Sequence, residues 1–331
     1  MKKILVTGGA GYIGSFIVRR LKEDGFEPFV VDDFLAGHLE AIEGFNYLQA
    51  NLLNDVDLER IDELFLKQKF DGLIHMASLI QMGESFRNPG KYFRSNLNIA
   101  LNLLDLVVKH KIPYVVFSSS AGVYGTPKKL PITEDSPKNP ENPYGETKLM
   151  IEKILGWYEQ AHGVQSVCIR YFNAAGAALN GEIGEDHPNE SHIIPLLIKA
   201  ALEGRTFTLF GNDYETNDGT CVRDYIHVLD LASAHTDALR YLIDGGESDV
   251  FNAGVGKGYS NMELVRGIEK LAGKFSWTFG PRRLGDADSL YADVKKIKTV
   301  LKWEPEYGLD EIIESAYKWH KKHPEGYIKI K

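Results

Sequence analysis

A tyrosine and a lysine lie four residues apart in "NPYGETK", where Tyr144 and Lys148 are the side chains best suited to acid–base chemistry. Asn142 is a favoured N-cap and Pro143 suits a first helical position, so the segment predicts the start of a helix. In a helix, the phenol and the ammonium share one face. A nearby ammonium lowers a phenol pKa from about 10 toward neutral, which would make Tyr144 a general base. A half-buried tyrosine beside a solvated lysine is the alternative, because this spacing alone is a weak signal.

Three glycines, Gly8, Gly11 and Gly14 in "TGGAGYIG", lie between a predicted strand and a predicted helix that ends at Gly25. Glycine permits a tight turn and lets the backbone approach a pyrophosphate at the helix N-terminus. In this context the glycines predict a dinucleotide site. The alternative is a flexible turn that binds nothing.

Polar residues end two of the predicted strands. Asp32 ends the second strand, 18 residues after Gly14, where a carboxylate can accept hydrogen bonds from the adenosine ribose. This carboxylate and its neighbour Asp33 would repel a 2′-phosphate, so NAD is favoured over NADP. Ser118 to Ser120 end the fifth strand, where a hydroxyl could share a proton network with Tyr144. The alternatives are a solvated acid and serines that only terminate a strand.

Apolar strands alternate with helical segments up to Asn173, which predicts an α/β fold with a doubly wound parallel sheet of the Rossmann type. Longer polar loops follow, with a return to the first domain around Ile226–Asn252. We therefore expect an NAD-binding domain of residues 1–175 plus about 225–255. Residues 176–224 and 256–331 would form a smaller α/β substrate-binding region.

The composition is ordinary for a soluble globular protein, with 331 residues, 44% hydrophobic and 25% charged. A net charge of −8 without a basic stripe argues against nucleic acid as a partner. No apolar run approaches the roughly 18 residues of a membrane span, and the run after "MKK" is too short for a signal peptide. Cys168 and Cys221 lack metal-ligand spacing and fit reduced thiols in the cytoplasm. No metal site is expected.

Blocks along almost the whole chain resemble the UDP-glucose 4-epimerase family of extended short-chain dehydrogenase/reductases, in the family's order. They are "TGGAGYIGS", "FSSSAGVYG", "NPYGETKLMIE", "RYFNAAGA", "GEDHPNESHIIP", "FGNDYETNDGTCVRDYIHVLDLA", "NAGVGKGYS" and "PRRLGDADSLYAD". The resemblance implies that Tyr144 takes the proton of the sugar 4-hydroxyl while the C4 hydride moves to bound NAD. Lys148 lowers the tyrosine pKa and holds the nicotinamide ribose, and Ser120 positions the 4-oxygen. The 4-keto sugar then rotates, and the returning hydride inverts C4, so NAD stays bound.

The resemblance also implies the residues around both ligands. For NAD these are Gly8, Gly11, Tyr12, Ile13, Gly14, Asp32, Asp33, Asn51, Leu52, Met76, Ala77, Ser95, Ser118, Tyr144, Lys148 and Phe172. For the UDP-sugar they are Ser120, Tyr144, Tyr171, Asn173, His192, Ile193, Thr208, Leu209, Phe210, Arg223, Tyr225, Arg283, Asp286 and Leu290. Arg223 and Arg283 would bind the diphosphate, because a guanidinium fork binds phosphate oxygens in pairs. Core packing is nearly as good an interpretation of Phe210, and Arg282 is expected to be solvated.

The sequence departs from many family members at Ile80, Asn51, Gly122 and Ser95. Ile80 removes a lysine contact to the cofactor phosphates, whereas Asn51 can still accept a hydrogen bond from adenine. Gly122 makes the sugar pocket roomier, and Asn96 remains beside Ser95. Leu290 matches a position near the sugar C2 substituent, where tyrosine excludes N-acetyl sugars. We therefore expect UDP-N-acetylglucosamine to be accepted to some degree as well as UDP-glucose.

Three other functions compete. A nucleotide-sugar 4,6-dehydratase needs an acid–base pair where this chain has Ala121 and Gly122. A UDP-uronic acid 4-epimerase needs a cation or several donors at the C6 carboxylate, and none can be located. A non-catalytic NAD-binding sensor usually lacks the tyrosine or the lysine, and both are present here. The resemblance also implies a homodimer.

Overall fold

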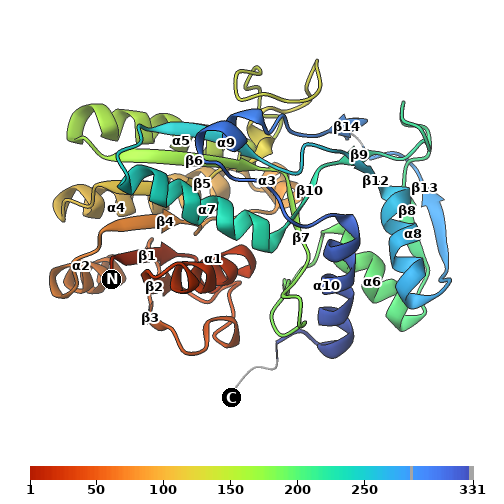
Figure 1. The fold of residues 1–331 in the computed structure, drawn as a ribbon, viewed down its shortest axis with the longest axis horizontal. Coiled ribbons are helices and arrows are strands. Elements are labelled where there is room, and N and C mark those ends of the chain that lie inside the picture. The colour runs from red at the N-terminus through yellow and green to blue at the C-terminus, as the bar shows by residue number, and fades with distance from the viewer. Residues whose placement is uncertain (284–285, 328–331) are drawn as a thin grey trace.

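A seven-stranded parallel sheet forms the centre of the computed structural model, which describes residues 1–283 and 286–327 (Figure 1). The strand order is β11-β6-β5-β4-β1-β2-β3. This topology confirms the predicted Rossmann-type sheet, and β11 shows that the returning segment supplies its seventh strand. The strands are β1 (Lys3–Thr7), β2 (Glu27–Asp32), β3 (Asn46–Gln49), β4 (Gly72–His75), β5 (Tyr114–Ser118), β6 (Gln165–Tyr171) and β11 (Asp249–Ala253).

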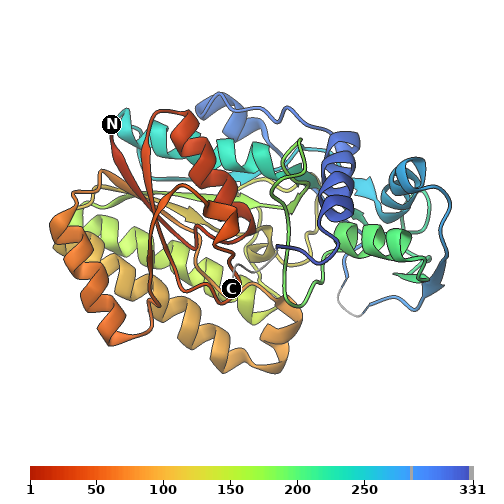
Figure 2. The same ribbon diagram turned by 90° about the horizontal axis from the view of Figure 1, so that it is seen from below.

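Helices cover both faces of this sheet (Figure 2). One face carries α1 (Tyr12–Glu23) and α7 (Val228–Ile243), and the other carries α2 (Asp55–Lys67), α4 (Pro89–Lys109) and α5 (Pro143–His162). Successive side chains of a strand point to opposite faces, so Ile4 and Val6 join one buried cluster and Leu5 joins the other. The near-continuous apolar runs of the central strands follow from this burial on both sides.

A smaller group of elements lies at one end of the sheet (Figure 1). Its core is a separate buried cluster that includes Leu197, Leu264 and Ile312. The elements are α6 (Ile193–Glu203), α8 (Asn261–Ala272), α10 (Leu309–Lys322), β8 (Phe207–Phe210) and β13 (Trp277–Gly280). The division of the chain into two domains at the residues given above stays a prediction.

Short strands connect the large sheet to the smaller group. β7 (Asn173–Ala175) pairs with β10 (Tyr225–His227), and β9 (Val222–Arg223) lies between β12 (Tyr259–Ser260) and β14 (Ser289–Leu290). The segment after Asn173 was expected to be loop, so β7 is an addition. The remaining short helices are η1 (Glu40–Ile42), α3 (Met82–Arg87), η2 (Ala121–Val123) and α9 (Lys295–Val300). Among the described residues, no helix combines the length and apolar character that a membrane crossing requires.

Candidate active site

The first two turns of α5 carry Tyr144 and Lys148 one turn apart, as the sequence predicted. The side chain of Asn142 caps this turn by accepting a hydrogen bond of 2.8 Å from the backbone N–H of Gly145, and Pro143 occupies the first helical position. This capping satisfies one of the free N–H groups at the helix start. The turn is therefore held rigidly where β5 and β6 end.

Lys148 lies inside the protein, with 1% of its surface exposed. Its Nζ donates to the carbonyl of Ser118 at 2.8 Å and to Oγ of Ser78 at 3.0 Å. The same atom lies 5.6 Å from the centroid of the Tyr144 ring. Burial lowers the pKa of Lys148 to about 7. The lysine thus titrates near neutral pH, and its hydrogen bonds hold it against the end of β5.

The hydroxyl of Tyr144 belongs to a small network of hydroxyl groups. Hydrogen bonding with Ser120 lowers the pKa of Tyr144 and hydrogen bonding with Tyr171 raises it, while Tyr171 also bonds Ser118. Burial is the largest influence and raises the pKa of Tyr144 well above its ordinary value. The expectation that Lys148 brings this pKa toward neutral is therefore wrong for the protein alone, because desolvation of both groups outweighs their proximity.

The space around each glycine of the turn shows whether a dinucleotide can bind there. A Cβ at Gly14 would lie 2.2 Å from the carbonyl oxygen of Gly8, and a Cβ at Gly8 would lie 2.6 Å from the backbone nitrogen of Ala77. Packing alone therefore explains these two glycines. A Cβ at Gly11 would meet only the Gly8 carbonyl, at 3.4 Å, within the described chain. The same Gly11 starts α1 without a side-chain cap among the described residues. An open helix N-terminus of this kind fits a pyrophosphate.

Asp32 lies beside this turn with 8% of its surface exposed. Its Oδ2 accepts the N–H of Ala10 at 2.9 Å and its Oδ1 accepts the N–H of Phe34 at 2.8 Å. The carboxylate thus positions the glycine turn, and its remaining lone pairs fit ribose hydroxyls. Asp33 accepts the N–H of Leu35 at 2.9 Å. In Asn51 the amide oxygen expected to face adenine accepts the N–H of Leu53 at 2.8 Å.

Other predicted cofactor residues lie around the same edge of the sheet. Met76 and Ala77 follow β4, and the N–H of Met76 donates to the carbonyl of Thr7 at 3.0 Å. Asn96, beside Ser95, holds the segment that contains Ile80 through two bonds to the backbone of Leu79. The remaining predicted cofactor residues are Tyr12 and Ile13 in the first turn of α1, Leu52, which is buried, and Phe172, which directly follows β6.

The two arginines that were predicted to bind the diphosphate lie on the side of the smaller group of elements. Arg223 has 13% of its side chain exposed and donates to the carbonyls of Val222 and Ala287, at 2.9 Å and 2.8 Å. Its Nη2 lies 3.8 Å from Oδ1 of Asp286, so these two predicted residues are adjacent. The guanidinium of Arg283 lies over the Phe210 ring, 4.3 Å from the centroid. This places three polar groups and one aromatic ring near each other.

Arg282 is exposed, as expected for a solvated arginine. Its guanidinium pairs with the carboxylate of Asp288 and lies 4.0 Å from the centroid of the Tyr214 ring. The neighbouring residues 284 and 285 of the "PRRLGDADSLYAD" block lie outside the described residues.

Leu209, predicted on the uracil side, cannot offer its side chain to a ligand. Its side chain is completely buried in the core of the smaller group, because it points inward from β8. Only its backbone is left for a ligand. Thr208 is exposed, and Phe210 is partly buried beside Arg283. The other predicted sugar residues lie in the short strands: Asn173 in β7, Tyr225 in β10 and Leu290 in β14.

His192 is the N-cap residue of α6, and Ile193 starts that helix. The imidazole Nδ1 of His192 bonds the carboxylate of Glu185, and 51% of the side chain is exposed. His75 and His227 are buried and pair with hydroxyls of Thr7 and Ser315, in keeping with the structural roles expected for them.

A buried ion pair beneath the candidate site was not predicted. Arg170 of β6 and Glu152 of α5 are 4% and 6% exposed, and their closest contact is 2.6 Å. Oε1 of Glu152 also accepts a hydrogen bond of 2.5 Å from Oγ of Ser119. Glu152 lies one turn after Lys148, so the spacing Tyr144–Lys148–Glu152 on one helical face was the available signal.

Known proteins resemble this chain over nearly its full length. Residues 4–254 match the NAD dependent epimerase/dehydratase family. A UDP-glucose 4-epimerase of Lactobacillus helveticus is 46% identical over 328 residues, which are 98% of this chain and 99% of that protein. The crystal structure of UDP-glucose 4-epimerase from Brucella ovis in complex with NAD is 40% identical with a TM-score of 0.92, covering 96% of this chain and 98% of that one. The UDP-Glc/GlcNAc 4-epimerase from Campylobacter jejuni is 37% identical with a TM-score of 0.85, covering 97% and 100%.

Proposed function

The chain belongs to the NAD dependent epimerase/dehydratase family, and from this premise we propose that it interconverts UDP-glucose and UDP-galactose by inverting C4 of the sugar. The observation that carries this proposal is the hydroxyl network of Tyr144, Ser120 and Tyr171, which lies at the same edge of the parallel sheet as the open N-terminus of α1. The near full-length similarity to UDP-glucose 4-epimerases supports it. The dehydratase, uronic acid and sensor alternatives gain no support from these observations.

NAD is the cofactor, in keeping with the family and with the Brucella ovis complex. We propose that the backbone N–H groups of the first turn of α1 hold its pyrophosphate, and that Asp32 holds the adenosine ribose. The acid at Asp32 favours NAD over its 2′-phosphorylated form. When bound, NAD supplies a reversible hydride acceptor for the sugar C4.

Proton transfer falls to Tyr144 in this proposal. Its hydroxyl would take the proton of the sugar 4-hydroxyl and later return it, with Ser120 holding the same oxygen. The phenolate is the form that accepts this proton, and burial disfavours it in the protein alone, so the phenol must first release its own proton to water beside a positively charged Lys148. Lys148, whose pKa is about 7, would supply positive charge below neutral pH and hold the nicotinamide ribose.

Inversion requires the oxidised sugar to present its other face to the same catalytic side, so the nucleotide must stay anchored while the sugar turns. Arg223 and Arg283 are the proposed diphosphate anchors, and Asp286 would accept the uridine ribose hydroxyls. Arg223 suits this role because its carbonyl contacts and Asp286 fix its guanidinium before any ligand arrives.

Turnover without added cofactor tests the proposal. Purified protein should convert UDP-galactose to UDP-glucose with no NAD supplied, followed by NMR of the sugar signals, because each cycle regenerates the cofactor. Conversion only with stoichiometric NAD would contradict retention. No conversion even with NAD added would overturn the epimerase function and leave the sensor as the better interpretation.

We further propose that the protein is a homodimer in the cytoplasm. The family resemblance suggests the dimer, and a second copy could cover Trp157 on α5, which is 66% exposed. Both cysteines are free and buried, which suits a reducing compartment. Light scattering during size exclusion should give twice the 37.1 kDa chain mass, and a monomer mass would refute the dimer.

A further inference from the structure

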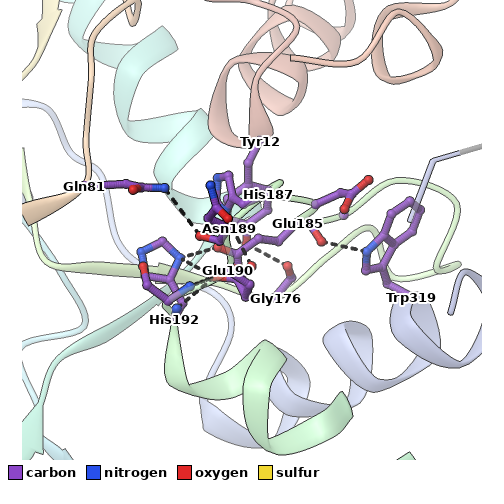
Figure 3. Close-up of polar contacts among 12 residues, drawn as sticks. Tyr12, Gln81, Gly176, Glu185, His187, Asn189, Glu190, His192 and Trp319 are labelled. Atoms are coloured by element: carbon purple, nitrogen blue, oxygen red, sulfur yellow. Dashed lines mark hydrogen bonds and ion pairs between the residues drawn. The ribbon is translucent and has the colours of Figure 1, made fainter. Parts of the chain in front are cut away.

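Four potential metal ligands come together in the loop between β7 and α6. They are Glu185, His187, Glu190 and His192, and their ligand atoms all lie within 4.8 Å of one another (Figure 3). The sequence analysis expected no metal, because it considered only the spacing of the two cysteines. We propose that these four side chains bind one divalent transition-metal ion of the zinc class.

The separations between the ligand atoms fit this class of ion. Tetrahedral zinc with bonds of about 2.0–2.2 Å places neighbouring ligand atoms about 3.3–3.5 Å apart. Nδ1 of His187 lies 3.3 Å from Oε1 of Glu185 and 3.4 Å from Oε2 of Glu190. Nδ1 of His192 lies 3.5 Å from Oε1 of Glu190. Its direct hydrogen bond to Glu185 is shorter than these separations, so these two atoms must move apart when an ion binds. Two imidazoles and two carboxylates suit zinc or cobalt better than magnesium or calcium, which prefer oxygen ligands throughout.

Surrounding contacts already hold the ligands in place. Oε1 of Glu190 accepts the backbone N–H groups of Ser191 and His192, at 2.7 Å and 2.8 Å. The carbonyl of Glu185 accepts the indole N–H of Trp319 at 3.0 Å, and the ring of Tyr12 meets His187 edge-on with centroids 6.3 Å apart (Figure 3). Such outer contacts orient metal ligands.

The negative charge of the cluster and its access to solvent also agree with a bound ion. Glu185 and Glu190 have only 4% and 7% of their side chains exposed, so two buried negative charges need compensation. In the protein alone the imidazoles of His187 and His192 provide it through their contacts with these carboxylates. A dication would replace both imidazole protons, which leave to water. His192 is half exposed and offers the entry path.

The position of the cluster assigns it a structural role. It lies in the loop that leads from β7 to α6, which is one of the connections between the large sheet and the smaller group of elements. The loop touches α1 through Tyr12, and Nε2 of Gln81 donates to the carbonyl of Asn189 at 3.4 Å. A metal ion would fix this loop against both neighbours and set the start of α6 at His192.

Cobalt binding by the full-length, untagged protein tests the proposal. After treatment with a chelator, the protein is titrated with Co²⁺, whose visible absorption reports four-coordinate binding. We expect saturation at one ion per chain and loss of the bands when Zn²⁺ is added. His187→Gln should weaken binding at least ~10-fold, whereas His162→Gln, on the last turn of α5, should leave it unchanged.

Two results would overturn the proposal. One is the absence of saturable Co²⁺ binding by the unaltered protein, which would make the cluster an ion-pair network only. The other is equal binding by His187→Gln and His162→Gln. If His187→Gln does not fold, Glu190→Gln serves in its place. The absorption signal does not depend on turnover, so the metal site and the proposed epimerase activity can fail separately.

Discussion

Tyr144 and Lys148 lie one turn apart on α5, with 5% and 1% of their surfaces exposed. Burial moves their pKa values in opposite directions. The phenol pKa rises above its ordinary value while the ammonium pKa falls to about 7. Each shift favours the neutral form, as desolvation does. The pair in the protein alone is thus a neutral hydroxyl beside a partly charged amine, and the phenol must lose its proton before it can act as a base.

Leu290 is the residue that we expect to decide whether N-acetyl sugars are accepted as substrates. Because leucine is smaller than tyrosine, we expect the protein to convert UDP-N-acetylgalactosamine as well as UDP-galactose. Leu290→Tyr should lower kcat/KM for the N-acetyl sugar at least ~10-fold, since about 1.4 kcal/mol of steric cost gives that factor, and leave UDP-galactose within about twofold.

NMR of both reactions measures this ratio, and Leu66→Tyr, at an exposed position near the end of α2 and away from the predicted site residues, is a matched control. If the unaltered protein does not turn over the N-acetyl sugar at saturation, the permissive role of Leu290 is wrong.

In the strand–turn–helix element of β1 and α1, one glycine is needed for packing and another is expected to be needed for ligand binding. A Cβ at Gly14 would clash with the Gly8 carbonyl at 2.2 Å, whereas a Cβ at Gly11 meets it only at 3.4 Å. Gly14→Ala should therefore destabilise the fold by about 1–3 kcal/mol or more. Gly11→Ala should fold normally and retain little NAD, because its methyl group occupies the approach of the pyrophosphate.

Thermal unfolding of both variants after removal of cofactor, together with the NAD released per chain from untreated samples, measures these effects. Unfolding without cofactor excludes the stabilisation that ligand binding itself provides. Gly11→Ala with a full complement of NAD would show that the open turn has another purpose.

Helix α5 depends on the buried pair of Glu152 and Arg170. Glu152→Gln leaves the Arg170 guanidinium inside the protein without its counter-charge, so we expect a loss of about 3–5 kcal/mol in the free energy of unfolding. Glu63→Gln, which removes an exposed i,i+4 partner of Lys67 on α2, should cost less than about 0.5 kcal/mol. Urea unfolding of the two variants compares them directly, and equal losses would show that α5 does not rely on this pair.

At the scale of the whole molecule, Asp224 joins the segment after β11 of the large sheet to the segment after the short strand β14. Its carboxylate accepts backbone N–H groups of Val255, Gly256 and Ala292, at 2.8, 3.1 and 3.1 Å. Burial is the largest influence on its pKa and raises it to about 6. A raised carboxyl pKa adds stability that is complete below its unfolded value of about 3.9 and is lost as pH rises through 6.

Asp224→Asn removes this titration. The stability deficit of the variant should therefore shrink between pH 4 and pH 7, by up to about 3 kcal/mol. Urea unfolding across that range measures the difference between variant and unaltered protein. A deficit that stays constant or grows with pH would contradict the raised pKa.

The sequence predicted the layered sheet because apolar runs and glycine turns are local signals, and the strands from β1 to β6 follow them. It did not predict the Glu152–Arg170 pair or the cluster from Glu185 to His192, because those depend on how elements pack. Tertiary structure also determines which groups are desolvated. For this reason the sequence did not predict that the pKa of Tyr144 is raised or that the side chain of Leu209 is buried. The site assignments around NAD and the UDP-sugar remain predictions.

The most direct test of the central claim is kcat for UDP-galactose epimerisation by Tyr144→Phe, beside Tyr158→Phe on the same helix. Tyr158 bonds Asp105 through its hydroxyl at 2.6 Å, so its variant controls for loss of a phenol from α5. We predict a fall of about 10²–10⁴ in kcat for Tyr144→Phe, with unchanged thermal unfolding, and near-normal turnover for Tyr158→Phe. Equal activity of the two variants would contradict the assignment of proton transfer to Tyr144.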